Sequence, residues 1–240
     1  MTILQDIINF VLPSRCALCG RILSVDKGIC DDCIKNIEFI KEPVCFVCGQ
    51  PLFCETSEHG KNLLCANCLK KRRQTFRFSR SAFAYDNFSK KLILDFKFYE
   101  RTDIASLLAK MMLVAGEDIF NAGVDVIVPV PLYYTRLIKR KYNQSALLAK
   151  ELSKLTNIKA DNFTLSKIRQ TLPQVECTGH ERINNVKGAF AVKNIQAIKN
   201  KRVLLVDDVL TTGSTLKECS LTLKKAGAKS VDNLTVARVI

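Results

Sequence analysis

No apolar run in the 240-residue sequence is long enough to cross a membrane. A bilayer requires roughly 20 apolar residues, and runs such as residues 203–206 fall far short of that length. The apolar stretch at residues 3–12 is interrupted by Asp6, follows no basic residue and precedes no small-residue cleavage site. It therefore lacks the features of an export signal. We expect a cytoplasmic protein without a membrane span, whose first residues form a short amphipathic helix.

Two common glycine-rich nucleotide motifs are also missing. The sequence contains neither the Gly-Lys-Ser/Thr ending of a Walker loop nor a Gly-x-Gly-x-x-Gly stretch. Acidic residues are scarce, because 23 Asp and Glu stand against 37 Lys and Arg and leave a formal net charge of +14. Such a surplus favours an acidic partner, either nucleic acid or a phosphate ligand.

Cysteines are abundant and unevenly placed. Nine of the 11 lie between residues 16 and 68. Eight of them form Cys-x-x-Cys pairs: Cys16/Cys19, Cys30/Cys33, Cys45/Cys48 and Cys65/Cys68. Two such pairs can hold one Zn²⁺ as a tetrahedron of thiolates, and Gly20 and Gly49 permit the tight turn beneath the metal. A disulfide framework would require an oxidising compartment, for which the sequence shows no export signal.

The spacing predicts two zinc sites but leaves their pairing open. Sequential pairing joins the first four of these cysteines and then the last four, and crossed pairing is also compatible with the spacing. Cys54 and His59 could replace a ligand or could be exposed loop residues. Four thiolates leave no coordination position for a substrate water, so the sites are structural. We expect a zinc-binding module over residues 1–72 and a second domain over residues 73–240.

Basic residues cluster in a strip that follows the cysteines. Eight thiolates and two Zn²⁺ lower the net charge to about +10, so a surplus remains. The strip has no acidic residue, and its candidates for nucleic-acid contact are Lys70, Lys71, Arg72, Arg73, Arg77 and Arg80. Phe76 and Phe78 are interleaved, which suits single-stranded nucleic acid. Alternatively, the strip is a domain boundary followed by a strand whose phenylalanines face the core.

A second basic cluster follows the turn at Pro129 and Pro131. Its members are Arg136, Lys139, Arg140 and Lys141. Basic residues at the carboxyl end of a parallel strand are well placed for an anionic ligand. Nucleic acid is a candidate for Lys139 and Lys141, and a pyrophosphate group is a candidate for Arg136 and Arg140.

The remainder of the chain has the pattern of an α/β domain. Residues 124–130, 203–206 and 231–236 have the composition of buried strands, and residues 105–112 and 146–155 have helical periodicity. This alternation predicts a mostly parallel sheet with helices on both faces.

The most informative segment is the end of the strand at residues 203–206. Asp207 and Asp208 come directly after it, and a small-residue loop then opens a helix that we expect to end near Ala226. The loop residues are Thr211, Thr212, Gly213, Ser214 and Thr215. Helix-start N–H groups and these hydroxyls suit a phosphate monoester, while the two carboxylates can accept hydrogen bonds from the vicinal hydroxyls of a sugar. Helix capping alone would need only one of the hydroxyls.

Residues 203–215 resemble the phosphoribosyl-diphosphate (PRPP) motif of type I phosphoribosyltransferases, and nearly the whole chain resembles the ComF family of competence proteins. Further marks are Pro129-Val130-Pro131, the stretch at residues 140–144, Thr171, Gln174, Glu181-Arg182 and residues 185–190. The resemblance implies that Asp207 and Asp208 bind ribose hydroxyls and that residues 211–215 bind the 5′-phosphate. It also implies that the turn after Val128 contacts pyrophosphate, usually with Mg²⁺.

Two functions follow from this reading. The ComF resemblance implies handling of single-stranded DNA in the cytoplasm during natural transformation, with other competence proteins as further partners, and the basic surplus agrees with it. Alternatively, the domain is a phosphoribosyltransferase that transfers a ribosyl phosphate from PRPP to an unidentified acceptor. Asp207 or Asp208 would then stabilise the cationic transition state, and Mg²⁺ with Arg136 or Arg140 would neutralise the leaving pyrophosphate. We rank DNA handling first.

Overall fold

The computed structural model describes residues 13–23, 28–53, 62–70, 74–99, 101–171 and 184–240. The expected helix at residues 3–12, together with Cys54 and His59, lies outside the described residues. So does the predicted domain boundary between residues 72 and 73, which stays a prediction.

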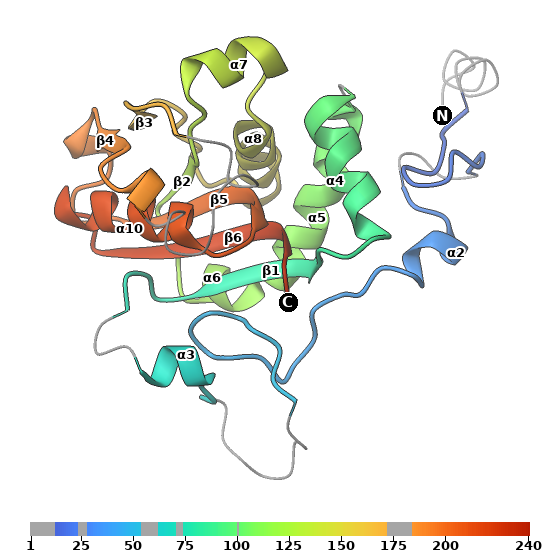
Figure 1. The fold of residues 1–240 in the computed structure, drawn as a ribbon, viewed down its shortest axis with the longest axis horizontal. Helices are drawn as coiled ribbons and strands as arrows, with labels where there is room; N and C mark the ends of the chain where they lie inside the picture. Colours follow the sequence, from blue (N-terminus) through green and yellow to red (C-terminus); the bar gives the residue numbers. More distant parts are fainter. Residues whose placement is uncertain (1–12, 24–27, 54–61, 71–73, 100, 172–183) are drawn as a thin grey trace.

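A four-stranded parallel sheet forms the centre of the molecule (Figure 1). The strand order is β1 (Ser79–Ala84), β6 (Ser230–Arg238), β5 (Arg202–Leu210) and β2 (Val126–Pro129). The central strand β5 is apolar on both faces before its acid pair, since alternate residues enter two different cores. Leu204 and Val206 join one buried cluster, whereas Val203 and Leu205 join the other. The predicted parallel α/β sheet is confirmed.

Helices cover both faces of the sheet. Leu204 and Val206 pack in the cluster that contains buried residues of α4 (Ser89–Phe98), α5 (Ala105–Ala115) and α8 (Gln144–Thr156). The opposite face is covered by α10 (Ser214–Lys225), which ends one residue before the Ala226 that we expected. Short elements connect these parts: η1 (Thr102–Ile104), α6 (Glu117–Asn121) and η3 (Ile195–Ala197).

A small antiparallel pair of strands lies above α10. It consists of β3 (Leu165–Lys167) and β4 (Phe190–Val192), and Leu165 and Phe190 join the cluster on the α10 face. Helix α7 (Tyr134–Arg140) follows β2 and projects from the body of the molecule (Figure 1), and none of its residues is buried.

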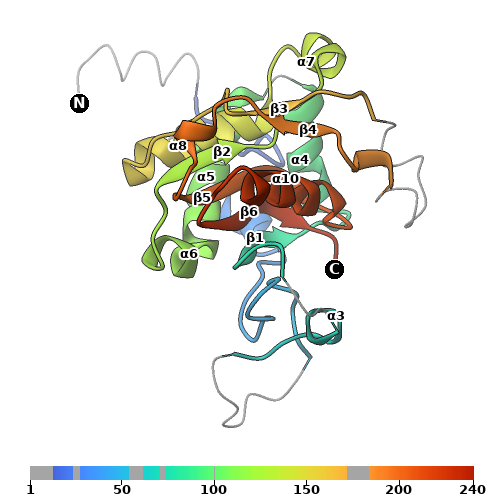
Figure 2. The ribbon, with the colours of Figure 1, turned by 90° about the vertical axis from the view of Figure 1, so that its left-hand side faces the viewer.

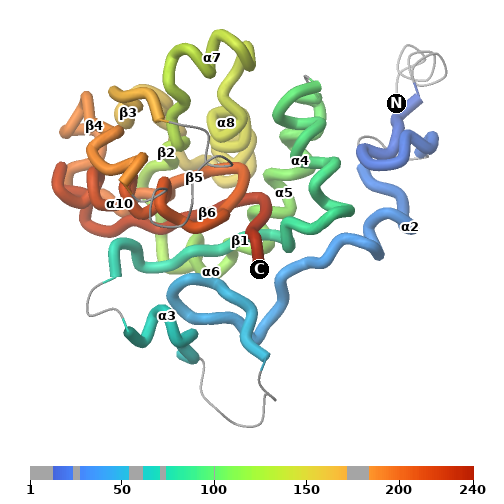
Figure 3. Tube along the Cα trace, viewed as in Figure 1, coloured from blue at the N-terminus to red at the C-terminus, as the bar shows by residue number. Residues whose placement is uncertain are grey.

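The cysteine segment runs beside the outer strand of the sheet. Its short helices, α2 (Asp31–Ile34) and α3 (Ala66–Leu69), begin directly after Cys30 and Cys65. Between them, the chain passes along β1, as the tube view shows (Figure 3). The Ala84 N–H donates to the Glu38 carbonyl oxygen at 2.8 Å, and the Ser79 N–H donates to that of Val47 at 2.7 Å. Figure 2 shows α3 below β1, on the side away from β6. The edge of the sheet is therefore covered, which removes an open site for strand pairing.

Among the described residues, no helix combines the length and the apolar character that a bilayer span requires.

Candidate functional site

Eight cysteines form two compact clusters in sequential order. The first contains Cys16, Cys19, Cys30 and Cys33, and the second contains Cys45, Cys48, Cys65 and Cys68; within each cluster all sulfur atoms lie within 4.8 Å of one another. The Sγ atoms of Cys19 and Cys30 are 3.6 Å apart, as are those of Cys48 and Cys65. Tetrahedral Zn–S bonds require S···S distances of about 3.8 Å. The chain therefore has two zinc-binding sites of four cysteines each, and sequential pairing is confirmed over crossed pairing.

Backbone N–H groups lower the pKa of one thiol in each zinc site. Burial raises the pKa of the Cys16 thiol, but N–H donors that include those of Cys19 and Cys30 outweigh it and lower this pKa to about 6. The same balance lowers the pKa of Cys45 to about 7. The thiolate form that zinc binds is thus accessible at neutral pH for one cysteine of each site, whereas burial and the neighbouring sulfurs raise the pKa of Cys33 and Cys68.

The second zinc site is built directly onto the sheet. The guanidinium of Arg238, a buried residue near the end of β6, donates to the Cys48 carbonyl oxygen at 2.6 Å and to Gln50 Oε1 at 2.7 Å. Gly49 has a φ of 66°, and a Cβ atom there would collide with the carbonyl oxygen of Ser79. Glycine is therefore required at this position both for the turn and for the close approach to β1.

The acid pair lies inside β5, which continues to Leu210 instead of ending before Asp207 as predicted, and the ends of two helices enclose it. Ser145, at the start of α8, donates its hydroxyl proton to Asp207 Oδ1 at 2.9 Å, and the Asp208 N–H donates to the same oxygen at 2.9 Å. Lys97, near the end of α4, places its Nζ 3.1 Å from Asp208 Oδ2. The side chain of Asp208 is only 12% exposed, so this ion pair is partly shielded from water.

The two adjacent carboxylates repel each other when both are charged. Burial, and next the charge of Asp208, raise the pKa of Asp207 to about 7. Lys97 neutralises one carboxylate, so a second cation at this strand end would relieve the remaining repulsion. A carboxyl group that titrates near neutral pH is also typical of a functional site, although structural networks produce such shifts too.

The small-residue loop connects this acid pair to α10. Gly213 precedes the helix with a φ of 73°, which favours glycine, and Thr212 Oγ1 lies 3.0 Å from Ser214 Oγ. Thr211 and Thr212 are exposed to solvent. The structure therefore places the predicted anion-binding loop after the predicted sugar-binding acids, separated from them by Val209 and Leu210 of β5.

Basic groups from α7 and β3 lie near the same strand end. Arg136 donates to the Thr171 carbonyl oxygen at 3.0 Å, and Lys167 donates to Thr171 Oγ1 at 2.8 Å. Burial, together with the charge of Arg136, lowers the pKa of Lys167 to about 8, and the charge of Asp207 acts in the opposite direction. Sequence patterns did not identify Lys97, Ser145 or Lys167, because each lies in an ordinary helix or strand and no local motif marks it.

The basic strip separates into structural and exposed residues. Arg77 pairs with the fully buried Asp232 at 2.5 Å, and Arg80 pairs with Asp118 at 2.5 Å. Their guanidinium groups also pack against the ring of Phe78, which itself packs against the main core. These contacts correct the assignment of Arg77 and Arg80 to nucleic-acid binding. Lys70 is exposed, whereas Lys71, Arg72 and Arg73 lie outside the described residues.

Exposed aromatic, apolar and basic side chains occur on α7 and at the end of α4. We call this the α4–α7 surface, and it comprises Phe98, Tyr99, Tyr134, Leu137, Ile138, Lys139 and Lys141. Tyr99 is 71% exposed and Tyr134 is 62% exposed. Arg140 joins the two elements, since its guanidinium lies 5.1 Å from the centre of the Phe98 ring. The sequence indicated the cations of this surface but not its aromatic residues.

Two family models match the chain. Residues 7–69 match the model of a double zinc ribbon domain. Residues 119–239, half of the chain, match the model of a phosphoribosyl transferase domain.

Similar proteins are found over the full length of the chain. Competence protein F of Haemophilus influenzae is 33% identical, and the match covers 93% of this chain and 96% of that protein. DNA utilization protein YhgH of Escherichia coli K12 is 32% identical, with 95% of this chain and 99% of that protein covered. Among solved structures, the allosteric regulatory enzyme of purine biosynthesis has a TM-score of 0.41 and 19% identity, covering 60% of this chain and 30% of that one.

Proposed function

We propose, because this chain belongs to the ComF family of competence proteins, that it handles single-stranded DNA in the cytoplasm during natural transformation. The observation that carries this proposal is the α4–α7 surface. Large apolar side chains are usually withdrawn from water, yet Tyr99, Tyr134 and Ile138 are more than half exposed there. Single-stranded nucleic acid is bound by aromatic faces that stack with the bases and by cations that follow the phosphates.

The basic surplus supports the same proposal. Lys139 belongs to α7, as Tyr134 does, Lys141 follows the helix at its C-cap, and both lysines are exposed. Each phosphate that such a cation neutralises releases counterions, so the affinity should fall steeply with salt. We further propose that Lys70, Lys71, Arg72 and Arg73 contact the strand at a second place, and that other competence proteins deliver or receive the strand.

We also propose a phosphoribosyl-binding site at the end of β5. In this proposal, residues 211–215 hold the 5′-phosphate, Asp207 and Asp208 accept hydrogen bonds from the ribose hydroxyls, and Arg136 and Arg140 face the pyrophosphate. The residues present also fit Mg²⁺, since two carboxylates are adjacent, the Lys97 ammonium group pairs with the carboxylate of Asp208, and carboxylate oxygens are the ligands that this ion prefers. When bound, Mg²⁺ would neutralise the charge of the diphosphate.

A second candidate function is phosphoribosyl transfer, and the pKa of Asp207 favours it. A carboxyl group that titrates near 7 can carry its charge when a cationic sugar develops in the transition state. Release of pyrophosphate from PRPP in the presence of an amine or a base would establish transfer.

The DNA proposal is tested with a labelled single-stranded oligonucleotide and fluorescence anisotropy. Tyr134→Ala should weaken binding about tenfold, because loss of one stacking partner costs roughly 1–3 kcal/mol. Phe163→Ala removes another strongly exposed ring, 84% exposed between α8 and β3, and should leave the affinity unchanged. Equal affinities of the two variants would refute the assignment of DNA binding to the α4–α7 surface.

The phosphoribosyl proposal is tested by calorimetric titration of PRPP with Mg²⁺. Asp208→Asn should reduce this affinity by at least tenfold, since it removes the charge that pairs with the cation. DNA binding measured on the same sample should not change, which would show that the two sites are separate. Undiminished PRPP affinity would contradict the site assignment.

A further inference from the structure

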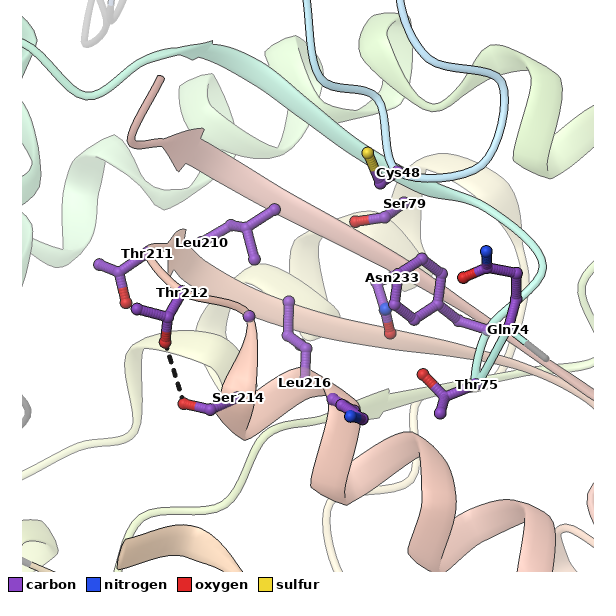
Figure 4. Close-up of a pocket in the computed structure, with 13 residues that line it drawn as sticks. Cys48, Gln74, Thr75, Ser79, Leu210, Thr211, Thr212, Ser214, Leu216 and Asn233 are labelled. Atoms are coloured by element: carbon purple, nitrogen blue, oxygen red, sulfur yellow. Dashed lines mark hydrogen bonds between the residues drawn. The ribbon is translucent and has the colours of Figure 1, made fainter. Parts of the chain in front are cut away.

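A cavity of about 370 Å³ lies between α10, residues 74–76 and the second zinc site (Figure 4). Pockets that hold small molecules usually have volumes of about 300–1,000 Å³. The loop contributes Thr211, Thr212, Gly213 and Ser214 to the lining, but neither Asp207 nor Asp208 takes part in it. The cavity is therefore a different place from the proposed phosphoribosyl site, although the two share a loop.

A buried amide group without a partner lines this cavity. Asn233 is 0% exposed, and its Oδ1 accepts a hydrogen bond from the Ser220 hydroxyl at 3.2 Å. Its Nδ2 is buried and has no hydrogen-bond partner within the described part of the chain. Figure 4 shows this side chain between Leu216 and Gln74. Because buried N–H donors are nearly always paired in proteins, Asn233 is suited to donate to a group that enters the cavity.

The remaining walls suit a flat, mostly apolar molecule. Leu210, Leu216 and the half-buried Phe76 supply apolar surface. Phe76 thus lines the cavity, whereas Phe78 packs in the core, so the expectation that both phenylalanines face the core holds only for Phe78. At the rim, the exposed Lys217 and Thr212 offer a cation and a hydroxyl.

We propose that this cavity binds a nucleobase. The base packs against Phe76 and accepts a hydrogen bond from Asn233 Nδ2 through a ring carbonyl oxygen, as thymine and guanine can. Its sugar phosphate extends to the rim, where Lys217 offsets the negative charge. The apolar walls match the base, the amide of Asn233 matches a carbonyl oxygen of the base, and the cation at the rim matches the phosphate. The base belongs either to a free nucleotide or to a strand, and only the second source rests on the proposed DNA handling.

The zinc site contributes to this binding as part of the wall. Cys48 lines the cavity, and the Cys48 carbonyl oxygen is held by Arg238. Zinc bound to Cys48 would therefore hold one wall of the cavity in place without contacting the base.

The experiment measures binding of thymidine by ligand-observed NMR, and of an eight-residue oligothymidine and an abasic strand of equal length by anisotropy. Two cavity variants, Asn233→Leu and Phe76→Leu, are compared with Phe163→Leu, which changes an exposed ring outside the cavity. Phe76 is only half-buried, so Phe76→Leu keeps the test valid if Asn233→Leu does not fold. The full-length, zinc-loaded protein is used throughout.

We expect the two cavity variants to lose at least tenfold in affinity for a thymine-containing ligand, while Phe163→Leu binds like wild type. Loss for thymidine identifies a free nucleotide as the source, and loss for oligothymidine alone identifies a base within a strand. If wild type binds no strand but binds thymidine through Asn233, the DNA proposal fails and this one stands. The proposal is overturned if the cavity variants bind both ligands like wild type, or if wild type binds neither thymidine nor oligothymidine better than the abasic strand.

Discussion

The two zinc sites have the same number of cysteines and the same sequential pairing, but they join the rest of the molecule differently. The first site lies in the large buried cluster that also contains α4 and one face of the sheet, to which it contributes Cys16, Cys30, Cys33 and Leu18, and the Lys91 ammonium group donates to the Leu18 carbonyl oxygen at 2.5 Å. The second is tied to the strands themselves, through Ser79 of β1 and Arg238 of β6. We expect a metal site that is hydrogen-bonded to strands to influence the sheet directly, and one that packs through apolar side chains to influence it less directly.

The largest expected difference between the sites concerns loss of the metal. Cys45→Ser and Cys16→Ser should each lower bound zinc from two ions to one per chain, because three thiolates hold the ion far less firmly. Cys45→Ser should also destabilise the sheet by several kcal/mol, since the contacts of Arg238 and Ser79 depend on the knuckle. Zinc content by atomic spectroscopy and thermal unfolding by circular dichroism measure both effects. Equal unfolding temperatures would remove the distinction between the sites.

A smaller difference is expected at the glycines of the two knuckles. Gly20 and Gly49 both have positive φ angles, but only at Gly49 would a Cβ atom meet the backbone of β1. Gly20→Ala should cost about 1 kcal/mol for the left-handed backbone alone. Gly49→Ala should cost about 3 kcal/mol, because the strand must also move. Urea unfolding of the two variants gives these values, and similar losses would mean that the contact with Ser79 is soft.

The smallest effect on stability is expected at Asp207. This residue belongs to neither zinc site, so its pH dependence can be compared with that of the zinc sites. Its pKa is raised to about 7 in the folded state, so the fold loses stability as pH rises from the ordinary carboxyl pKa to about 7. Relative to Asp207→Asn, wild type should lose about 1 kcal/mol between pH 6 and pH 7.5. The zinc sites have the opposite dependence, since protons displace the metal from thiolates as pH falls. Parallel stability curves for the two proteins would contradict the raised pKa.

Local patterns predicted the parts of this molecule that depend on neighbouring residues. The Cys-x-x-Cys spacing indicated both knuckles, Gly213 occurs at the expected turn, and the apolar runs became β5 and β6. In each case the physical requirement, such as a metal tetrahedron or a positive φ, is met within a few residues.

The sequence did not reveal features that depend on residues distant along the chain. Arg77 and Arg80 appeared to be free cations, but they pair with Asp232 and Asp118, which come from other elements. In the sequence, nothing distinguishes Asn233 from other residues of a strand. It lines the cavity as a possible donor only because α10 and residues 74–76 pack around it. Such partners are set by tertiary packing, which a single sequence does not display.

The position of β1 has a consequence for how the protein is made. Its two flanking segments leave the ribosome at very different times: residues 38–47 precede it, whereas β6 follows it, with Ser81 and Thr235 separated by 154 positions. At about 5–20 residues per second, the earlier partner is present for roughly ten seconds or more before the later one appears. The two outer strands therefore leave the ribosome before the two central ones, and we expect the zinc-bearing segment to cover one edge of β1 while its other edge awaits β6.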